Sequence, residues 1–313
     1  MKPATFAAGL AALASALMLR DLRALSRIPV VAPAPDGAAE PPVSVIIPAR
    51  DEERVIERAV RGVMAQRYAN WTLTVLNDHS TDRTGAILAG LAAEDGRIAV
   101  LDGAELPAGW VGKCWACWQA AQAAGGDWLL FLDADTQPQP ELIAAGVAYA
   151  EAEGLDLLTV MPLLELGSFW ERAILPAFLS IIEAAFPLDK INDPASDVVL
   201  ANGQCILVRR AAYERAGGHR AVRDKVLEDV ELAQAVVRAG GRLRVADGRH
   251  LIAVRMYTNG AEVREGLTKN AIAGLRNGGP RSAWAGARQA MVAFAPPGLL
   301  LGALWATLRR WPV

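Results

Sequence analysis

Two aspartates, Asp133 and Asp135, directly follow the uncharged run WLLFL at residues 128–132. An apolar run of this length predicts a buried strand, and open α/β folds bind their ligands beyond the carboxyl ends of such strands. Two carboxylates this close repel each other, so a positive group must lie near them. A divalent cation with oxygen ligands, Mg²⁺ or Mn²⁺, meets that need and can also hold a phosphate. A solvated turn at the strand end is the alternative, since aspartate pairs are common in turns.

A second acidic pair, Glu228 and Asp229, stands near the start of a predicted helix over residues 227–238. Adjacent residues on a helix do not share a face, so only one of the two is expected to point at a reacting group. The alternative is an acidic first turn that only complements the helix dipole.

The elements that would position these acids alternate between strands and helices. Apolar runs predict strands over residues 43–48, 72–77, 97–101, 128–132, 155–160, 204–209, 242–246 and 251–256. Helical spacing predicts helices over residues 55–64, 113–124, 139–153, 227–238 and 262–275, and one that starts at a Ser80 or Thr81 cap and ends near Glu94. Strands that alternate with helices over about 100 residues indicate an α/β fold with a doubly wound, mostly parallel, Rossmann-like sheet.

Four loops fall at the carboxyl ends of these strands, at residues 48–52, 77–80, 106–113 and 133–135. In a parallel sheet such loops converge on one crevice. An acidic crevice with one lysine and a helix N-terminus suits a nucleoside diphosphate that is bridged by a metal ion.

Composition limits the class of protein. The chain has 313 residues, a net charge of −2, 53% hydrophobic residues and a mean hydropathy of +0.22. The length suits one large domain with or without appendages, and the charge gives no basic footprint for nucleic acid. Three cysteines form no disulfide framework and suit a reducing compartment. We expect the C-x-x-C at Cys114 and Cys117 to be packing thiols rather than a redox or metal site.

Both ends of the chain are apolar. Residues 3–19 and 289–308 contain no charged side chain, and each stretch is close to the roughly 17–25 residues that span a bilayer. We therefore expect an N-terminal membrane anchor at residues 1–24, a Pro- and Ala-rich linker at 25–42, and a C-terminal membrane segment at 285–313. Pro296-Pro297 would kink the last segment, and its topology stays open.

Positive charge flanks the first apolar segment, with Lys2 before it and Arg20, Arg23 and Arg27 after it. This excess predicts that the main domain lies on the cytoplasmic side of the cytoplasmic membrane. The rival interpretation is a cleaved signal peptide with a small-residue site at Ala14-Ser-Ala16. Residues 169–188 are also apolar nearly all round, which indicates either a core helix or a helix in the membrane interface.

The motifs VSVIIPARDEE, VLNDHSTDRT, GK at 112–113, FLDADT and LEDVEL follow one another in this order. The ordered set resembles family 2 glycosyltransferases of the GT-A fold, and the resemblance covers residues 43–276 as one catalytic domain. GKCWACWQA, the apolar stretch near 170–186 and RMYTNGAEVREGLTKN resemble the membrane-associated branch that includes hopene-associated and carotenoid-modifying enzymes.

The resemblance implies a role for each matching residue. Pro48, Arg50 and Glu52 would line the nucleoside pocket, and Asp78 would hydrogen-bond the base. Lys113 would lie near the diphosphate, and Asp133 would face the ribose and the metal ion. Asp135 would bind the metal ion directly, and Asp229, beside Glu228, would be the base that activates the acceptor hydroxyl. One base and one displacement imply inversion at the anomeric carbon.

The acceptor side is less constrained. Arg255 and Tyr257 alternate on a predicted strand and could face the acceptor or the diphosphate. The Q-x-x-R-W motif of processive members is absent, which favours a single transfer, and Gln119 replaces an Asn that many soluble members carry. His250 is expected to be structural rather than a metal ligand. We expect a nucleotide-sugar donor and a lipid acceptor of hopanoid, carotenoid or polyprenyl type.

Two other functions remain open from the sequence. A nucleotidyltransferase would also use an acidic metal site on a doubly wound sheet, although the loop PARDEE lacks the glycines that usually follow its first strand. A catalytically silent membrane protein that binds nucleotide sugars is the second alternative. The motifs identify neither the donor sugar and nucleotide nor the oligomeric state.

Overall fold

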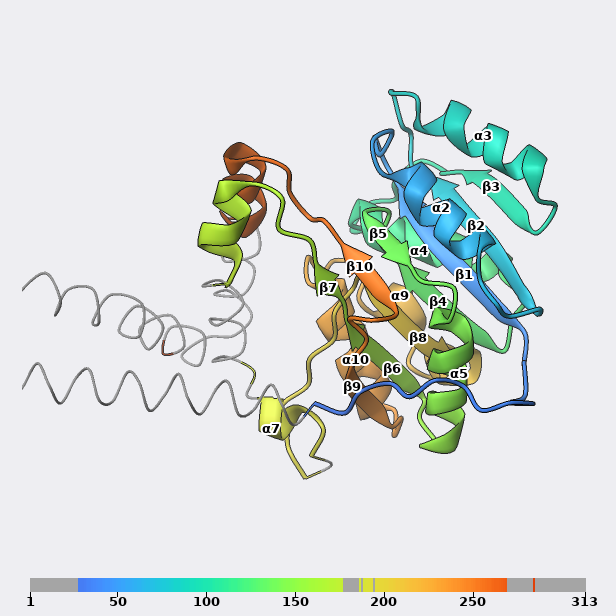
Figure 1. Ribbon diagram of the computed structural model, residues 1–313, viewed down its shortest axis with the longest axis vertical. Helices are drawn as coiled ribbons and strands as arrows, with labels where there is room; N and C mark the ends of the chain where they lie inside the picture. The colour runs from blue at the N-terminus through green and yellow to red at the C-terminus, as the bar shows by residue number, and fades with distance from the viewer. Residues whose placement is uncertain (1–27, 177–185, 187, 194, 269–283, 285–313) are drawn as a thin grey trace, which may run out of the picture. The chain divides into compact units, whose positions relative to one another are not determined.

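The computed structural model describes residues 28–176, 186, 188–193, 195–268 and 284 (Figure 1). The chain divides into two compact units. The first, here called the sheet unit, comprises residues 29–166 and 194–256. The second unit comprises residues 1–28, 167–193 and 257–313.

The sheet unit is built on a seven-stranded sheet with the order β3-β2-β1-β4-β8-β6-β9. Its strands are β1 (Val43–Ala49), β2 (Trp71–Asn77), β3 (Ile98–Asp102), β4 (Trp128–Leu132), β6 (Leu157–Met161), β8 (Cys205–Arg209) and β9 (Leu243–Asp247). Strand β8 runs antiparallel to both of its neighbours, β4 and β6, and all other pairs are parallel. The prediction of a mostly parallel α/β sheet is confirmed.

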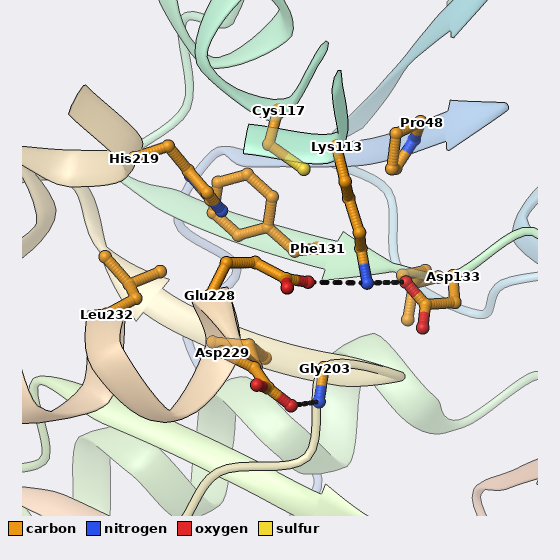
Figure 2. A pocket seen from close by; sticks show the side chains of 12 residues that line it. Pro48, Lys113, Cys117, Phe131, Asp133, Gly203, His219, Glu228, Asp229 and Leu232 are labelled. Atoms are coloured by element: carbon orange, nitrogen blue, oxygen red, sulfur yellow. Dashed lines mark hydrogen bonds and ion pairs between the residues drawn. The ribbon is translucent and has the colours of Figure 1, made fainter. Parts of the chain in front are cut away.

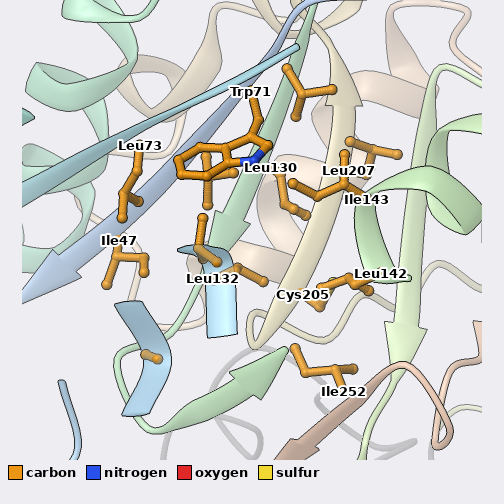
Figure 3. Packing of buried hydrophobic residues seen from close by; sticks show 14 of the residues in the cluster. Ile47, Trp71, Leu73, Leu130, Leu132, Leu142, Ile143, Cys205, Leu207 and Ile252 are labelled. Atoms are coloured by element: carbon orange, nitrogen blue, oxygen red, sulfur yellow. The ribbon is translucent and has the colours of Figure 1, made fainter. Parts of the chain in front are cut away.

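Helices cover both faces of this sheet (Figure 1). They are α2 (Ile56–Met64), α3 (Thr84–Glu94), α4 (Gly112–Ala123), α5 (Leu142–Ala152), α8 (Arg210–Arg215), α9 (Gly218–Ala221) and α10 (Glu228–Arg238). Because strand side chains alternate between faces, Val45 and Ile47 of β1 enter one buried cluster and Ile46 enters the other. Figure 3 shows the first cluster, in which Trp71, Leu130 and Leu207 come from three different strands. The second cluster lies under α4 and α10.

A three-stranded sheet, β5-β10-β7, holds the chain that follows the aspartate pair. Strand β5 (Thr136–Pro138) begins one residue after Asp135 and pairs antiparallel with β10 (Ile252–Val254), which pairs in parallel with β7 (Leu163–Leu164). Strands of two or three residues are too short for a period-2 pattern, so β5 and β7 were not predicted.

Residues 29–42, which were expected to belong to a linker, are part of the sheet unit. The Asp247 amide donates to the carbonyl of Pro29 (2.8 Å), and the Val31 amide donates to the carbonyl of Asp247 (3.1 Å). Tyr68 Oη donates to the carbonyl of Pro41 (2.6 Å). Val30 also forms a parallel bridge with Asp247, so residues 29–31 lie alongside strand β9, and Val31 is fully buried there.

The second unit contains helical residues at 169–176 and 260–268, and the short α7 (Leu188–Ile191). Phe169 and Trp170 are exposed and in edge-to-face contact, with ring centroids 5.4 Å apart. None of the helices in the described ranges is both long and apolar enough to cross a bilayer. The expected membrane segments, residues 1–24 and 285–313, lie outside the described residues.

Gly126 generates a prediction about stability, because a β-carbon there would lie 2.6 Å from the amide nitrogen of Ser44 on β1. Gly126→Ala should lower the free energy of unfolding by about 1–3 kcal/mol through steric overlap. Gly90→Ala in helix α3, where no atom lies within 4 Å of the added carbon, should raise it by up to about 1 kcal/mol. Denaturant unfolding of both variants checks this; equal effects of the two substitutions would contradict it.

Candidate active site

The predicted site residues other than Arg255 and Tyr257 lie at or beyond the carboxyl ends of the strands or in the first turns of the helices α4 and α10. Pro48 is on β1, Arg50 and Glu52 follow β1, Asp78 follows β2, and the aspartate pair follows β4. Lys113 is in the first turn of α4, while Glu228 and Asp229 begin α10. A pocket here is lined by Pro48, Lys113, Cys117, Phe131, Leu132, Asp133, Gly203, Ile206, His219, Glu228, Asp229 and Leu232 (Figure 2).

Lys113 joins the two acidic pairs. Its Nζ lies 2.7 Å from Oδ1 of Asp133 and 2.7 Å from Oε1 of Glu228 (Figure 2). Burial lowers the pKa of Lys113, but the charges of Asp133 and Glu228 outweigh burial and raise this pKa well above its ordinary value. The lysine is therefore a fixed cation between two parts of the chain that are more than 90 residues apart.

Glu228 and Asp229 have different partners. Burial disfavours ionisation of Glu228, but the charge of Lys113 outweighs it and lowers the pKa of Glu228. Asp229 instead accepts hydrogen bonds from the amides of Gly203 (2.9 Å, Oδ2) and Val230 (2.8 Å, Oδ1). Burial and the nearby charge of Glu228 raise the pKa of Asp229 to about 6. Asp229 is thus the carboxyl group of the pair whose proton affinity suits a general base near neutral pH.

Asp135 and Glu52 form the second part of the acidic crevice. Burial, then the charge of Asp133, raises the pKa of each to about 7. Oδ1 of Asp135 is buried and has no hydrogen-bond partner in the described part of the chain. An orphaned carboxylate oxygen among like charges fits a cation ligand. Within the described ranges, no three acidic, His or Cys side chains are drawn together closely enough to hold a metal ion by themselves.

The loops after β1 and β2 are bonded to each other. Both contain a non-glycine residue in the left-handed region, Asp51 (φ 56°) and His79 (φ 57°). Oδ1 of Asp51 accepts from the Thr81 amide (2.7 Å), and the Glu52 amide donates to Oγ1 of Thr84 (2.8 Å). These bonds fix the wall that holds Glu52. The predicted Ser80 or Thr81 cap of helix α3 was wrong: Thr84 begins the helix.

Asp78 follows β2 beside this wall, with 14% of its side chain exposed. His79 Nδ1 lies 3.1 Å from its Oδ1, and an Arg50 guanidinium nitrogen lies 3.7 Å from its Oδ2. A β-carbon at Gly103 or Gly112 would lie 3.2 or 3.4 Å from the carboxylate oxygens. Both glycines therefore allow their loops to close around Asp78.

The structure changes the prediction for Arg255 and Tyr257. Strand β10 ends at Val254, so neither residue is on a strand and the expected alternation does not apply to them. Arg255 belongs to the sheet unit and Tyr257 to the second unit. His250 is exposed in the turn before β10.

The cysteines behave as packing residues. Cys114, Cys117 and Cys205 are buried free thiols. Burial raises the pKa of Cys114 to about 12, and its Sγ donates to the carbonyl of Val222 (3.4 Å). A thiol that stays protonated near neutral pH is a poor nucleophile and metal ligand, so the expectation of packing thiols agrees with the structure.

Sequence reasoning missed His219, Tyr213 and Gly203. His219 lines the pocket and Gly203 binds Asp229, but both lie between predicted elements and carry no motif. The run Gly217-Gly218-His219 was the available signal, because Gly217 and Gly218 adopt φ of 82° and 53°. Two successive left-handed residues mark a turn with a specific shape.

Comparisons with known proteins agree with this geometry. Residues 44–217 match the profile of "Glycosyl transferase family 2". The "4,4'-diaponeurosporenoate glycosyltransferase" of Staphylococcus haemolyticus (strain JCSC1435) is 25% identical over 248 residues, which cover 78% of this chain and 65% of that protein. The matched region thus spans less than two thirds of this relative's length.

Solved structures share the fold. The mannosyltransferase PcManGT of Pyrobaculum calidifontis, in complex with GDP-Man and Mn²⁺, has a TM-score of 0.61 at 20% identity, with 99% of this chain and 88% of that chain covered. Glucosyl-3-phosphoglycerate synthase of Mycobacterium tuberculosis, with Mn²⁺, UDP and phosphoglyceric acid, has a TM-score of 0.52 at 21% identity, with 76% and 79% covered. More than half of the chain matches one family profile, and its sheet carries that family's GT-A architecture: the protein belongs to glycosyltransferase family 2.

Proposed function

We propose that this protein transfers a single sugar from a nucleoside diphosphate sugar to an apolar acceptor at the membrane, with inversion at the anomeric carbon. The observation that carries the proposal is the pocket in Figure 2. Lys113 and Asp133 form one wall, and the carboxyl group of Asp229 lies on another. A leaving diphosphate and an attacking acceptor need these two kinds of group on opposite sides of one carbon atom.

The donor side is argued from charge and shape. Asp78 keeps 14% of its side chain exposed beside Gly103 and Gly112, and its carboxylate can accept from the ring N–H of a base. Pro48, at the end of β1, and Arg50 and Glu52, in the loop after it, would line the rest of the nucleoside pocket. Lys113 lies where a diphosphate would follow, and the solved structures named above contain GDP-Man or UDP. The nucleotide and the sugar of this protein's donor are not specified by these contacts.

A divalent cation fits the acidic crevice. Asp135, with its orphaned Oδ1, and Asp133 would hold the ion, and the diphosphate would complete its coordination, because Mg²⁺ and Mn²⁺ often use one or two carboxylates plus substrate phosphates. Both solved structures contain Mn²⁺. When bound, the ion would neutralise charge on the leaving diphosphate. The chain's own part is to hold two carboxylates ready at the end of β4.

The acceptor has two chemical forms worth separating. A hydroxyl acceptor must lose a proton during attack, and Asp229 is placed to take it. The curated relative is named for diaponeurosporenoate, a carotenoid acid, so a carboxylic acid is the second candidate acceptor. A carboxylate is already ionised near neutral pH and needs no base. Hopanoid and polyprenyl acceptors would belong to the first form.

Membrane attachment rests on the sequence. The uncharged residues 3–19 and 289–308 are long enough for anchors, and Lys2, Arg20, Arg23 and Arg27 favour a catalytic domain on the cytoplasmic side of the cytoplasmic membrane. One catalytic domain over residues 43–276, between these segments, is part of the proposal. Family membership argues against a nucleotidyltransferase, and the intact set of acidic residues and Lys113 argues against a silent binding protein.

The full chain in detergent tests the proposal. Labelled UDP- and GDP-sugars, total membrane lipid and Mn²⁺ should together give label in the lipid fraction from at least one donor. Each transfer should occur once and give a product of inverted anomeric configuration, which NMR of the product reports. Efficient transfer to a water-soluble sugar, or a retained configuration, would contradict the proposal.

Asp229 generates a prediction about pH and acceptor class. With a hydroxyl acceptor, Asp229→Asn should lower kcat by about 10²- to 10⁴-fold, because no base remains. Since the pKa of Asp229 is about 6, kcat/KM of the wild type should be constant above that pH and fall about tenfold per pH unit below it, as the base becomes protonated. With a carboxylic acid acceptor the loss should be less than about tenfold, since no proton needs to be removed.

Glu231→Gln is the matched control for Asp229→Asn, because it removes another carboxylate from the first turn of α10. It should leave kcat within about twofold, because Glu231 is half-buried and does not line the pocket. A wild-type activity with no acid limb, together with a large loss in Asp229→Asn, would contradict the base role.

A further inference from the structure

His219, in the short helix α9, is a buried pocket residue without a role in the proposed reaction. Only 3% of the residue is exposed, yet it lines the pocket with Lys113, Glu228 and Asp229. Its ring lies 4.9 Å from that of Phe131, and Figure 2 shows it reaching toward Glu228 from the wall opposite Asp133. The imidazole thus packs on the core through Phe131 and also borders the pocket, where a buried polar group needs a hydrogen-bond partner.

Tyr213, on α8, fixes the ring of His219. Its Oη accepts from the His219 amide (3.1 Å) and lies 2.9 Å from His219 Nδ1. A β-carbon at Gly218 would lie 2.5 Å from the tyrosine ring, so glycine at this position allows the close approach. The histidine is therefore held by two bonds to one buried side chain.

This arrangement determines the tautomer of His219. Tyr213 Oη already accepts one hydrogen bond, and no other described group accepts the hydroxyl proton. A buried hydroxyl without an acceptor is costly, so Tyr213 donates to Nδ1 and the ring proton is on Nε2. Burial lowers the pKa of His219 to about 4, so the ring is neutral near pH 7. Because Nδ1 accepts from Tyr213 and Nε2 carries the proton, the ring has no free lone pair with which to act as the base. No group in the described ranges accepts from Nε2–H.

The pocket position of Nε2–H matches the place of the transferred sugar. If the diphosphate lies at Lys113 and Asp133, and the acceptor lies at Asp229, the sugar that joins them occupies the space between. That space has carboxylates and Nε2–H for hydroxyl groups, and Phe131 and Leu232 for apolar faces.

We propose that His219, oriented by Tyr213, donates a hydrogen bond from Nε2 to a hydroxyl group of the transferred sugar and thereby contributes to donor-sugar selectivity. This inference rests on the proposed function. Tyr213 is a positioning residue, because it acts only through His219.

Calorimetry on the full chain in detergent, with Mn²⁺ and no acceptor, tests the sugar contact. UDP, GDP, UDP-glucose and GDP-mannose are the probes. His219→Phe should weaken binding of the sugar nucleotide by about tenfold, the effect of one hydrogen bond, and leave binding of the free nucleoside diphosphate unchanged. His219→Gln, which keeps an amide donor, should recover most of the affinity. His250→Phe, the same change at an exposed histidine, should change neither.

The outcomes separate the two proposals. A wild type that binds none of the probes overturns the proposed function and this inference with it. A wild type that binds sugar nucleotides, with His219→Phe unchanged or equally weakened toward free diphosphate, overturns this inference alone. Thermal unfolding of each variant shows whether an equal loss of affinity for all probes comes from misfolding. An equal loss with intact folding counts against a specific sugar contact.

Imidazole nitrogen chemical shifts test the role of Tyr213 without any turnover. NMR of the ¹⁵N-labelled chain at about pH 7 should show His219 as a neutral ring with its proton on Nε2. Tyr213→Phe should shift the ring toward a mixture of tautomers and weaken sugar-nucleotide binding without affecting the free diphosphate. A proton on Nδ1 in the wild type would overturn the assignment.

Discussion

Electrostatic repulsion among carboxylates at one sheet edge is the constraint on which the rest of the site depends. Asp133, Asp135, Glu52 and Glu228 are brought together because β1 and β4 are parallel neighbours and α10 begins at the same pocket. Lys113 offsets part of this repulsion through its two 2.7 Å ion pairs. Burial and the remaining repulsion from Asp133 together raise the pKa values of Glu52 and Asp135 to about 7. Such an arrangement of charges suits the cation and the diphosphate of the proposed function.

Strand pairing and hydrogen bonds hold these carboxylates in place against their mutual repulsion. Asp135 is followed at once by β5, whose pairing with β10 limits movement of the aspartate away from its neighbours. The loop that carries Glu52 is bonded to the loop after β2, and left-handed Asp51 and His79 are maintained by those bonds. On the other side, the Gly203 amide holds Asp229. Local strain and buried charge therefore occur together, as is common where a protein holds functional groups in place.

Much of the fold could be predicted because its signals are local and strong. The uncharged run at 128–132 ends at the residue where β4 ends, and the acidic residues that follow it predicted the place of the candidate site. The reversal of β8 could not be predicted, since strand direction depends on how the chain crosses the sheet and leaves no mark in the hydrophobic pattern. The bonds between the loops after β1 and β2 and the Tyr213–His219 pair were missed for a related reason. Each depends on side-chain contacts that only the folded backbone brings about.

The most direct test of the account is thermal unfolding of the wild type and Asp135→Asn at about pH 8, with and without Mn²⁺. The folded-state pKa of Asp135, about 7, lies above its ordinary value of 3.8, so its destabilising effect grows as pH rises between these values and is complete above them. Without metal, Asp135→Asn should therefore be more stable than the wild type, by between about 1 and 4 kcal/mol. Mn²⁺ should raise the Tm of the wild type and not that of the variant, while Asp36→Asn, at an exposed loop position, should behave as the wild type. A wild type that is insensitive to Mn²⁺, or a variant that is less stable without metal, would contradict the claim that the carboxylates beyond β4 repel one another and bind a cation.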